Sequence, residues 1–209
     1  MPGPQTLALF MLAALALNLT PGPDMLYVTA RSVGDGRRAG IVAALGIGAG
    51  TLVHITALAL GLAALLAAVP LAYDVLRIAG AVYLLVIGVQ LLWRPRRAGG
   101  TTVVAPASLN TVFAQAVVTN VLNPKVALFF LAFLPQFVDP AAGPALAQIV
   151  LLGLLFDVQG TVVNIAVALL ASGTTRRLRA NARVATLLQR LTGAIFVTLG
   201  VKLAAAGNR

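Results

Sequence analysis

The stretch Gly40–Val69 reads GIVAALGIGAGTLVHITALALGLAALLAAV, and its only ionisable side chain is His54. A helix needs about 20 apolar residues to cross the hydrocarbon core of a bilayer, so this stretch predicts a transmembrane helix. The whole chain agrees, because 60% of its 209 residues are hydrophobic and only 10% are charged. Soluble domains carry about 25% charged residues. We therefore expect an all-α integral membrane protein.

Six stretches of this kind predict six transmembrane helices in a single membrane domain, residues 1–209. They are Thr6–Ala30, Gly40–Val69, Leu71–Trp93, Thr111–Phe137, Ala145–Ser172 and Val184–Ala206. The last is the weakest, because Arg190 and Lys202 must extend toward opposite membrane interfaces. No lysine or arginine precedes the first stretch, so we interpret it as a retained helix and not as a cleaved signal peptide.

Basic residues dominate the charge, with 15 Lys and Arg against 5 Asp and Glu. The arginines gather in the first, third and fifth links between the predicted helices: Arg31, Arg37 and Arg38; Arg94, Arg96 and Arg97; Arg176, Arg177, Arg179 and Arg183. Basic links face the cytoplasm, which places both termini on the outer side. The expected partner is the lipid bilayer. Nucleic acid is not expected, because its binding needs a contiguous basic face.

The longest polar link, residues 94–110, is expected in the cytoplasm and separates two halves, residues 1–93 and 111–209. Each half holds three predicted helices, so the second half enters the membrane from the opposite side. This arrangement permits an inverted-topology repeat, which many transporters have.

The first predicted helix of each half is interrupted by proline. The interruptions read Asn18-Leu19-Thr20-Pro21-Gly22-Pro23-Asp24 and Asn120-Val121-Leu122-Asn123-Pro124-Lys125. Proline frees backbone groups, which a membrane tolerates only where protein or cavity water satisfies them. Asn123 is expected to cap the half-helix that follows. Either break alone is explained by packing, but breaks at corresponding positions point to a transport site.

Three charged residues lie well inside the predicted helices: Asp24, Lys125 and Asp157. Each costs about 2.5–3.5 kcal/mol at a helix centre. A structural ion pair between Lys125 and one aspartate is one explanation. The other is a zwitterionic amino acid as substrate. Lys125 and the half-helix N-termini would then bind its carboxylate, the aspartates its ammonium, and one aspartate would exchange a proton.

Small and polar residues recur at helical spacing beside these charges. Gly153, Asp157, Gly160 and Asn164 share one face of the fifth predicted helix, and Gly46, Gly50, His54 and Ala57 share one face of the second. The glycine faces are also compatible with a homo-oligomer. For His54 we favour a hydrogen bond across helices over a proton relay. The candidate translocation residues are Asp24, His54, Asn120, Asn123, Lys125, Asp157 and Asn164, with Thr20, Pro21, Gly22, Pro23 and Pro124 forming the breaks.

These motifs resemble the LysE/RhtB family of amino-acid exporters over essentially the whole chain. The likeness rests on Asn18–Asp24, on Asn123–Phe130, on Phe133–Phe137, on Gly46–Gly50 and on Tyr83–Gly88. It implies functional roles for Pro21, Gly22, Pro23, Asp24, Asn123, Pro124 and Lys125. It also implies export of amino acids or their derivatives across the bacterial inner membrane, driven by the proton motive force.

Three functions other than export of amino acids are compatible with parts of the sequence. A cation or metal exporter would use Asp24, Asp157 and His54, but the chain has few acidic residues and one histidine. A membrane enzyme lacks a nucleophile–base pair, and neither a cofactor nor a metal is expected. A non-transporting assembly factor would depend on Gly46 and Gly50 and not on the charges.

Overall fold

The computed structural model describes residues 2–68, 78, 81–82, 85–86, 88–90, 92–93, 105–171 and 182–205. Within these residues every regular element is helical. The elements are α1 (Pro4–Leu19), α2 (Pro23–Gly34), α3 (Arg37–Ala68), α5 (Leu109–Val121), α6 (Pro124–Leu128), the π-helix η1 (Phe129–Phe133), the 3-10 helices η2 (Leu134–Phe137) and η3 (Pro140–Ala142), α7 (Ala145–Ala171) and α9 (Ala182–Ala205). Most of the predicted third helix, Leu71–Trp93, and most of the linker 94–110 lie outside the described residues.

Among the described residues, two helices are long and apolar enough to cross a membrane, namely α7 and the Arg37–Gly61 part of α3. At about 1.5 Å per residue, the 32 residues of α3 extend about 48 Å. Two bent pairs meet the same criteria if each pair is counted as one span, which gives up to four spans in the described residues. The predicted second and fifth helices are therefore confirmed in type and close to their predicted bounds.

Both proline interruptions break their helix as predicted. The axes of α1 and α2 meet at 51°, and α5 meets the segment Pro124–Phe137 at 44°. In each case a proline occupies the first turn of the half-helix after the break, where its missing N–H costs no intrahelical hydrogen bond. The prolines thus end one half-helix and begin the next.

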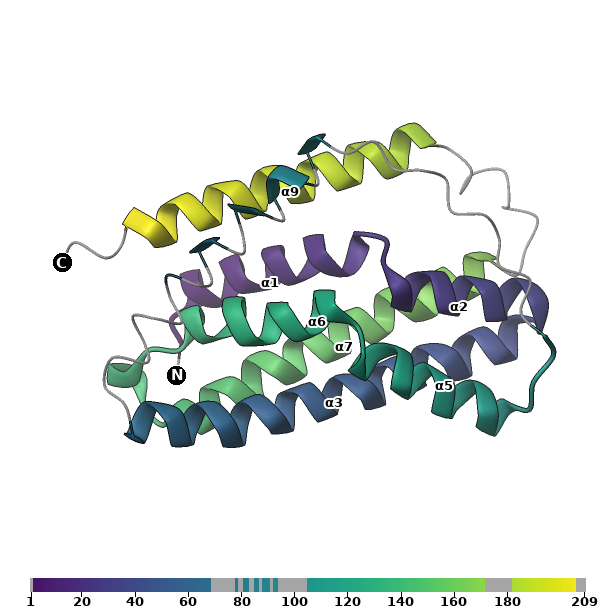
Figure 1. Cartoon of the computed structure of the whole chain (residues 1–209), viewed down its shortest axis with the longest axis horizontal. Coiled ribbons are helices and arrows are strands. Elements are labelled where there is room, and N and C mark those ends of the chain that lie inside the picture. Colours follow the sequence, from purple (N-terminus) through teal and green to yellow (C-terminus); the bar gives the residue numbers. More distant parts are fainter. Residues whose placement is uncertain are drawn as a thin grey trace.

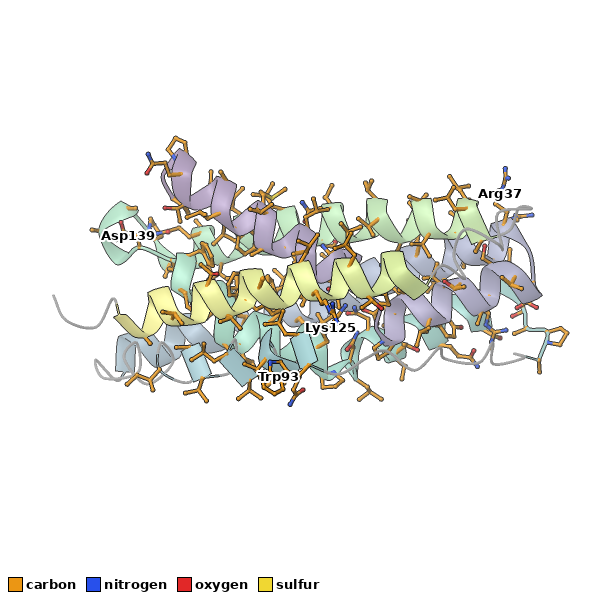
Figure 2. The ribbon with its side chains drawn as sticks, turned by 90° about the horizontal axis from the view of Figure 1, so that it is seen from above. Arg37, Trp93, Lys125 and Asp139 are labelled. Atoms are coloured by element: carbon orange, nitrogen blue, oxygen red, sulfur yellow. The ribbon has the colours of Figure 1, made fainter. Side chains whose placement is uncertain are left out.

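The two broken helices run in opposite directions, and their breaks lie near the middle of the bundle (Figure 1). The long helices α3 and α7 pack against each other and against the broken helices. Lys125, which follows the second break, lies between the end marked by Arg37 and the end marked by Asp139 (Figure 2). The charged residues of both breaks are therefore far from the ends of the bundle.

The end of the bundle that contains the start of α1 is packed with aromatic rings. Their contacts join α1, η1, η2, α7 and α9 through Phe10, Phe129, Phe130, Phe133, Phe137, Phe156 and Phe196. The ring centroids of Phe129 and Phe133 lie 4.7 Å apart. We call these residues the phenylalanine cluster. It forms an apolar plug on one side of the two breaks.

The opposite end, formed by α2 and α5, is held by a buried arginine. Arg31 is only 2% exposed, and its guanidinium donates to Asp35 Oδ2 at 2.8 Å, to Gln115 Oε1 at 2.6 Å and to the carbonyl of Ala105 at 2.9 Å. Tyr27 completes this arginine network through its hydroxyl. The sequence groups Arg31 with the membrane-orienting arginines of the first link, and it does not predict that Arg31 is buried and bound in this way. Arg37 and Arg38 of the same link are exposed.

The glycines of α3 let α5 approach closely. A Cβ on Gly46 would lie 2.6 Å from the carbonyl oxygen of Phe113, and one on Gly50 would lie 2.7 Å from Cβ of Asn120. This is the packing that small-residue motifs permit in membrane helices. Because α5 of the same chain covers Gly46 and Gly50, a second copy of the protein has no access to these two residues.

We predict that Gly46→Ala lowers the thermal unfolding midpoint in detergent, because the added methyl group meets backbone that cannot move aside. Overpacking of this kind costs about 1–3 kcal/mol. Gly61→Ala is the matched control, since Gly61 also lies in α3 but no atom of the described residues lies within 4 Å of the added Cβ. Equal midpoints for the two variants would contradict this packing.

Candidate functional site

The side chain of Lys125 joins the two helix breaks. Its ammonium donates to the carbonyl of Thr20 at 2.9 Å and to that of Leu17 at 3.2 Å, and both carbonyls belong to the end of α1. The last carbonyls of a helix carry partial negative charge, and that of Leu17 also accepts from the backbone N–H of Thr20. The cation of the second break thus satisfies backbone acceptors at the first.

Gly22 makes room for this contact. A Cβ at this position would lie 3.2 Å from Nζ of Lys125 and 3.3 Å from its Cε, so the lysine would have to move. The structural ion pair considered above is not formed, because the ion pair found within the described ranges joins Arg31 to Asp35. Lys125 is instead bound by backbone carbonyls.

Asp24 makes the reciprocal connection from the first break to the second. Its Oδ2 accepts a hydrogen bond of 2.9 Å from the side-chain amide of Asn120, in the last turn of α5. The hydroxyl of Thr51 in α3 lies 3.4 Å from Oδ1 of Asn120 and can donate to it. Asp24 and Asn120 are 7% and 1% exposed. The two motifs therefore form one buried polar unit.

Asn123 caps α6, as predicted. Its Oδ1 accepts from the backbone N–H of Lys125 at 3.0 Å, which fixes the orientation of the amide. This N–H was expected to help bind a substrate carboxylate, but the cap already uses it. Two buried atoms of the polar unit have no hydrogen-bond partner: Nδ2 of Asn123 and Oδ1 of Asp24. Orphaned buried groups of this kind are uncommon. The Asn123 amide is nonetheless near the Asp24 carboxyl group and stabilises its charged form.

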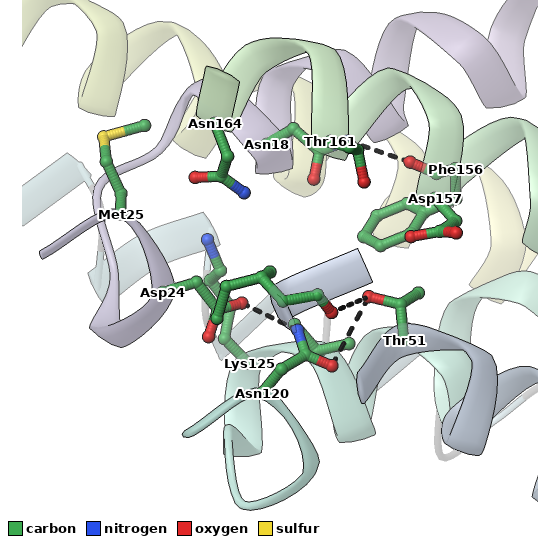
Figure 3. A pocket seen from close by; sticks show the side chains of 13 residues that line it. Asn18, Asp24, Met25, Thr51, Asn120, Lys125, Phe156, Asp157, Thr161 and Asn164 are labelled. Atoms are coloured by element: carbon green, nitrogen blue, oxygen red, sulfur yellow. Dashed lines mark hydrogen bonds between the residues drawn. The ribbon is translucent and has the colours of Figure 1, made fainter. Parts of the chain in front are cut away.

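A cavity of about 20 Å³ lies at the meeting point of the breaks (Figure 3). A cavity needs about 10–15 Å³ to hold one water molecule, so this one has room for water and must widen to admit an amino acid. The lining includes the charged residues of both breaks and polar residues of α1, α3 and α7: Asn18, Asp24, Met25, Ile47, Thr51, Asn120, Lys125, Val126, Phe156, Asp157, Gly160, Thr161 and Asn164. The polar unit is thus the wall of a chamber and not part of a dry core.

The polar face of α7 forms the wall opposite the breaks, with Asp157, Gly160 and Asn164 at its predicted helical spacing. Gly48 of α3 gives the carboxylate of Asp157 its space, because a Cβ there would lie 3.3 Å from Oδ1 of Asp157. Gly160 likewise leaves room for Asn18, whose Oδ1 would lie 3.0 Å from an added Cβ. Here the glycines shape a cavity as well as a helix contact.

Two predicted site residues do not line the cavity. Asn123 is almost fully buried behind it as the cap of α6. His54 lies 3.1 Å from the backbone oxygen of Asn120 through its Nε2, and its ring stacks on Phe130. This is the hydrogen bond across helices that the sequence favoured. Both residues support the site from outside.

Three polar residues of the lining were not among the predicted site residues, namely Asn18, Thr51 and Thr161. Asn18 directly precedes the first break, and Thr161 lies one helical turn after Asp157. Those positions were a usable signal for both. Thr51 follows Gly50 on the packed face of α3, and no chemical pattern in the sequence singles it out.

Within the residues described, no three His, Cys, Asp or Glu side chains are grouped so that they could hold a metal ion. His54, in particular, is occupied by Asn120 and Phe130. The geometry therefore offers nothing in favour of the metal-exporter alternative.

We predict that Asn123→Ala destabilises the protein by about 0.5–2 kcal/mol, the usual cost of losing an N-cap. Asn123→Ser is the control, because a serine hydroxyl can accept from the same backbone N–H. Thermal unfolding in detergent should give a lowered midpoint for the alanine variant and a nearly normal one for the serine variant. Similar losses in both would show that the cap is not the reason.

Comparison with known proteins identifies the family. The family of LysE type translocators matches residues 15–207. Similar proteins include the homoserine/homoserine lactone efflux protein of Salmonella typhimurium, 31% identical over 94% of this chain and 95% of that protein. The leucine efflux protein of an Enterobacter species is 29% identical over 93% of each. An uncharacterized membrane protein of Pseudomonas aeruginosa is 35% identical over 94% of each.

No solved structure is similar to this chain. The family match and the relatives each cover almost the entire sequence, so the assignment rests on the whole chain and not on the two motifs alone. Members of this family are transporters and not enzymes. The chain therefore belongs to the LysE family of translocators, and it is a membrane transporter.

Proposed function

We propose that this protein exports amino acids or amino-acid derivatives from the bacterial cytoplasm and that it does so in exchange for protons. The observation that carries the proposal is the cavity in which Asp24, Lys125 and Asp157 meet at two helix breaks. The relatives named for efflux of leucine and of homoserine or its lactone support the same substrate class.

The chemistry of the cavity suits a zwitterion. The unpartnered Oδ1 of Asp24 is an acceptor for an ammonium group, and it lies in a wall that also contains Lys125. Lys125 spends two of its three N–H donors on the carbonyls of α1, which leaves one for a carboxylate. Asn164 adds amide hydrogen-bonding capacity on the opposite wall. Met25, Ile47, Val126 and Phe156 supply apolar surface for a side chain.

We also propose that the protein has six transmembrane helices in two inverted halves, residues 1–93 and 111–209, joined by the linker 94–110. The opposite directions of the two broken helices support this arrangement (Figure 1). The charge pattern supports insertion in the inner membrane with the basic links in the cytoplasm and both termini outside. Any homo-oligomer would have to use a surface other than Gly46 and Gly50.

The transport proposal predicts that proteoliposomes containing the protein exchange labelled amino acids. The panel would contain the standard amino acids, homoserine and its lactone. Asp24→Asn should abolish exchange, because the buried acceptor for the ammonium is lost, while the amount of inserted protein stays normal. Asp139→Asn is the matched control, since Asp139 is exposed near one end of the bundle. Wild-type vesicles that exchange no compound of the panel would contradict the proposal.

The proposed orientation predicts a labelling pattern in intact cells. The chain has no cysteine, so a single introduced cysteine reports on one position. A membrane-impermeant maleimide should label Asp139→Cys, which follows the fourth predicted helix, and should label Arg38→Cys only after the cells are opened. Both native side chains are exposed. The reverse pattern would place the basic links outside and overturn the orientation.

A further inference from the structure

We infer that Asp157 is the carboxyl group that takes up and releases the coupled proton, while Asp24 stays a fixed ligand for the ammonium of the substrate. This assignment rests on the proposed exchange of amino acids for protons. The two aspartates lie in one cavity, and we assign their different roles from the groups that surround each of them.

Asp24 is surrounded by groups that hold a carboxylate. It lies in the first turn of α2, at the positive end of the helix dipole, and Asn120 donates to its Oδ2 at 2.9 Å. Lys125 lies in the same cavity wall. The Asn123 amide also stabilises the charged carboxyl group, while the remaining oxygen, Oδ1, is buried and accepts no well-formed hydrogen bond. A carboxylate that is held on one oxygen and unpaired on the other is suited to bind a cationic group of a ligand.

Asp157 has none of these partners. It lies near the middle of α7, away from either helix end, and it faces the Cα of Gly48 across the contact with α3. The polar group beside it is the hydroxyl of Thr161, one turn further along the same helix. Among the residues that the structure describes, no lysine, arginine or histidine forms an ion pair with it. Adding a proton to Asp157 therefore breaks no charged contact.

The titratable groups of the neighbouring elements are occupied or distant. Helix α1 has none. In α2, Tyr27 and Arg31 belong to the arginine network at the end of the bundle. In α3, His54 is bound to Asn120, while the two arginines of the first turn lie at the end of the helix.

The charged groups in the described part of the cavity lining are therefore Asp24, Lys125 and Asp157. With Asp157 ionised, these three carry one net negative charge, which attracts an ammonium group. With Asp157 protonated, they carry no net charge and the attraction is lost. The proton and the substrate thus compete for the cavity through its charge. A proton that binds on the acidic side releases the substrate there and leaves the carboxyl group again on the other side, which couples the two movements.

The test uses the full chain in proteoliposomes with labelled leucine and homoserine outside and an acidic lumen. With the membrane potential held at zero, one-for-one exchange with protons sustains about a tenfold accumulation per unit of pH difference. We expect accumulation with wild-type protein and none with Asp157→Asn. That variant should still exchange labelled for unlabelled substrate, with a raised KM that does not change with pH. Wild-type KM should rise as the pH falls.

Two further variants separate the proton role from a structural one. Asp157→Glu restores an ionisable group and should restore both the accumulation and a pH-dependent KM. Asp24→Asn should lose exchange itself at every pH. Asp139→Asn is the matched control and should behave as wild type, because the role of Asp139 Oδ1 in accepting from the N–H of Ala141 can be taken over by an amide oxygen.

The assignment is overturned if Asp157→Asn still accumulates substrate, if its KM still follows pH, or if it loses exchange altogether. It is also overturned if Asp157→Glu folds, as judged by gel filtration, but has a KM that does not depend on pH. Failure of the proposed function looks different, because wild-type protein would then exchange neither labelled nor unlabelled substrate at any pH.

Discussion

The interaction on which this structure depends is the contact between the Lys125 ammonium and the carbonyls of Leu17 and Thr20. A helix that breaks inside a membrane exposes backbone acceptors that lipid cannot satisfy. A lysine inside a membrane is equally costly without partners. Here the ammonium group supplies the donors that the carbonyls need, and the carbonyls supply the acceptors that the ammonium group needs. Asp24 and Asn120 repeat the same exchange in the opposite direction, from the first break to the second. The unit so formed can be buried and still leave one carboxylate oxygen unpaired.

The two ends of the bundle are held together by different kinds of interaction. The phenylalanine cluster closes one end by apolar packing, which has no direction and no fixed stoichiometry. The arginine network closes the other end by hydrogen bonds of defined geometry from Arg31 to Asp35, Gln115 and Ala105. The cavity lies between these two closures. Water can replace the partners of the guanidinium, whereas opening the phenylalanine cluster exposes a large apolar surface.

The features that could be predicted from the sequence are those whose polar or charged groups carry a high free-energy cost in lipid. The breaks at Pro21 and Pro124, the cap by Asn123 and the gathering of Asp24, Lys125 and Asp157 in one cavity followed from the cost of unsatisfied groups in lipid. The partner of Lys125 did not follow, because a backbone carbonyl leaves no mark in the sequence. The burial of Arg31 did not follow either, for a related reason. A buried arginine and a solvated one look alike until the fold brings Gln115 and Ala105 beside it. Thr51 was not predicted because it lies beside Gly50, and the glycines of α3 indicate a helix-packing face and not a binding site.

The partners of Lys125 at the end of α1 are main-chain atoms, and this has an evolutionary consequence. The contact with Lys125 requires a particular backbone path at residues 17 and 20, but it does not require particular side chains there. Those positions can drift among relatives as far as Lys125 is concerned, constrained only by their own packing. Gly22 has less freedom, since a Cβ there would lie 3.2 Å from the lysine Nζ and the end of that side chain would have to shift by a small amount. We therefore expect small residues at this position in lineages that retain the lysine.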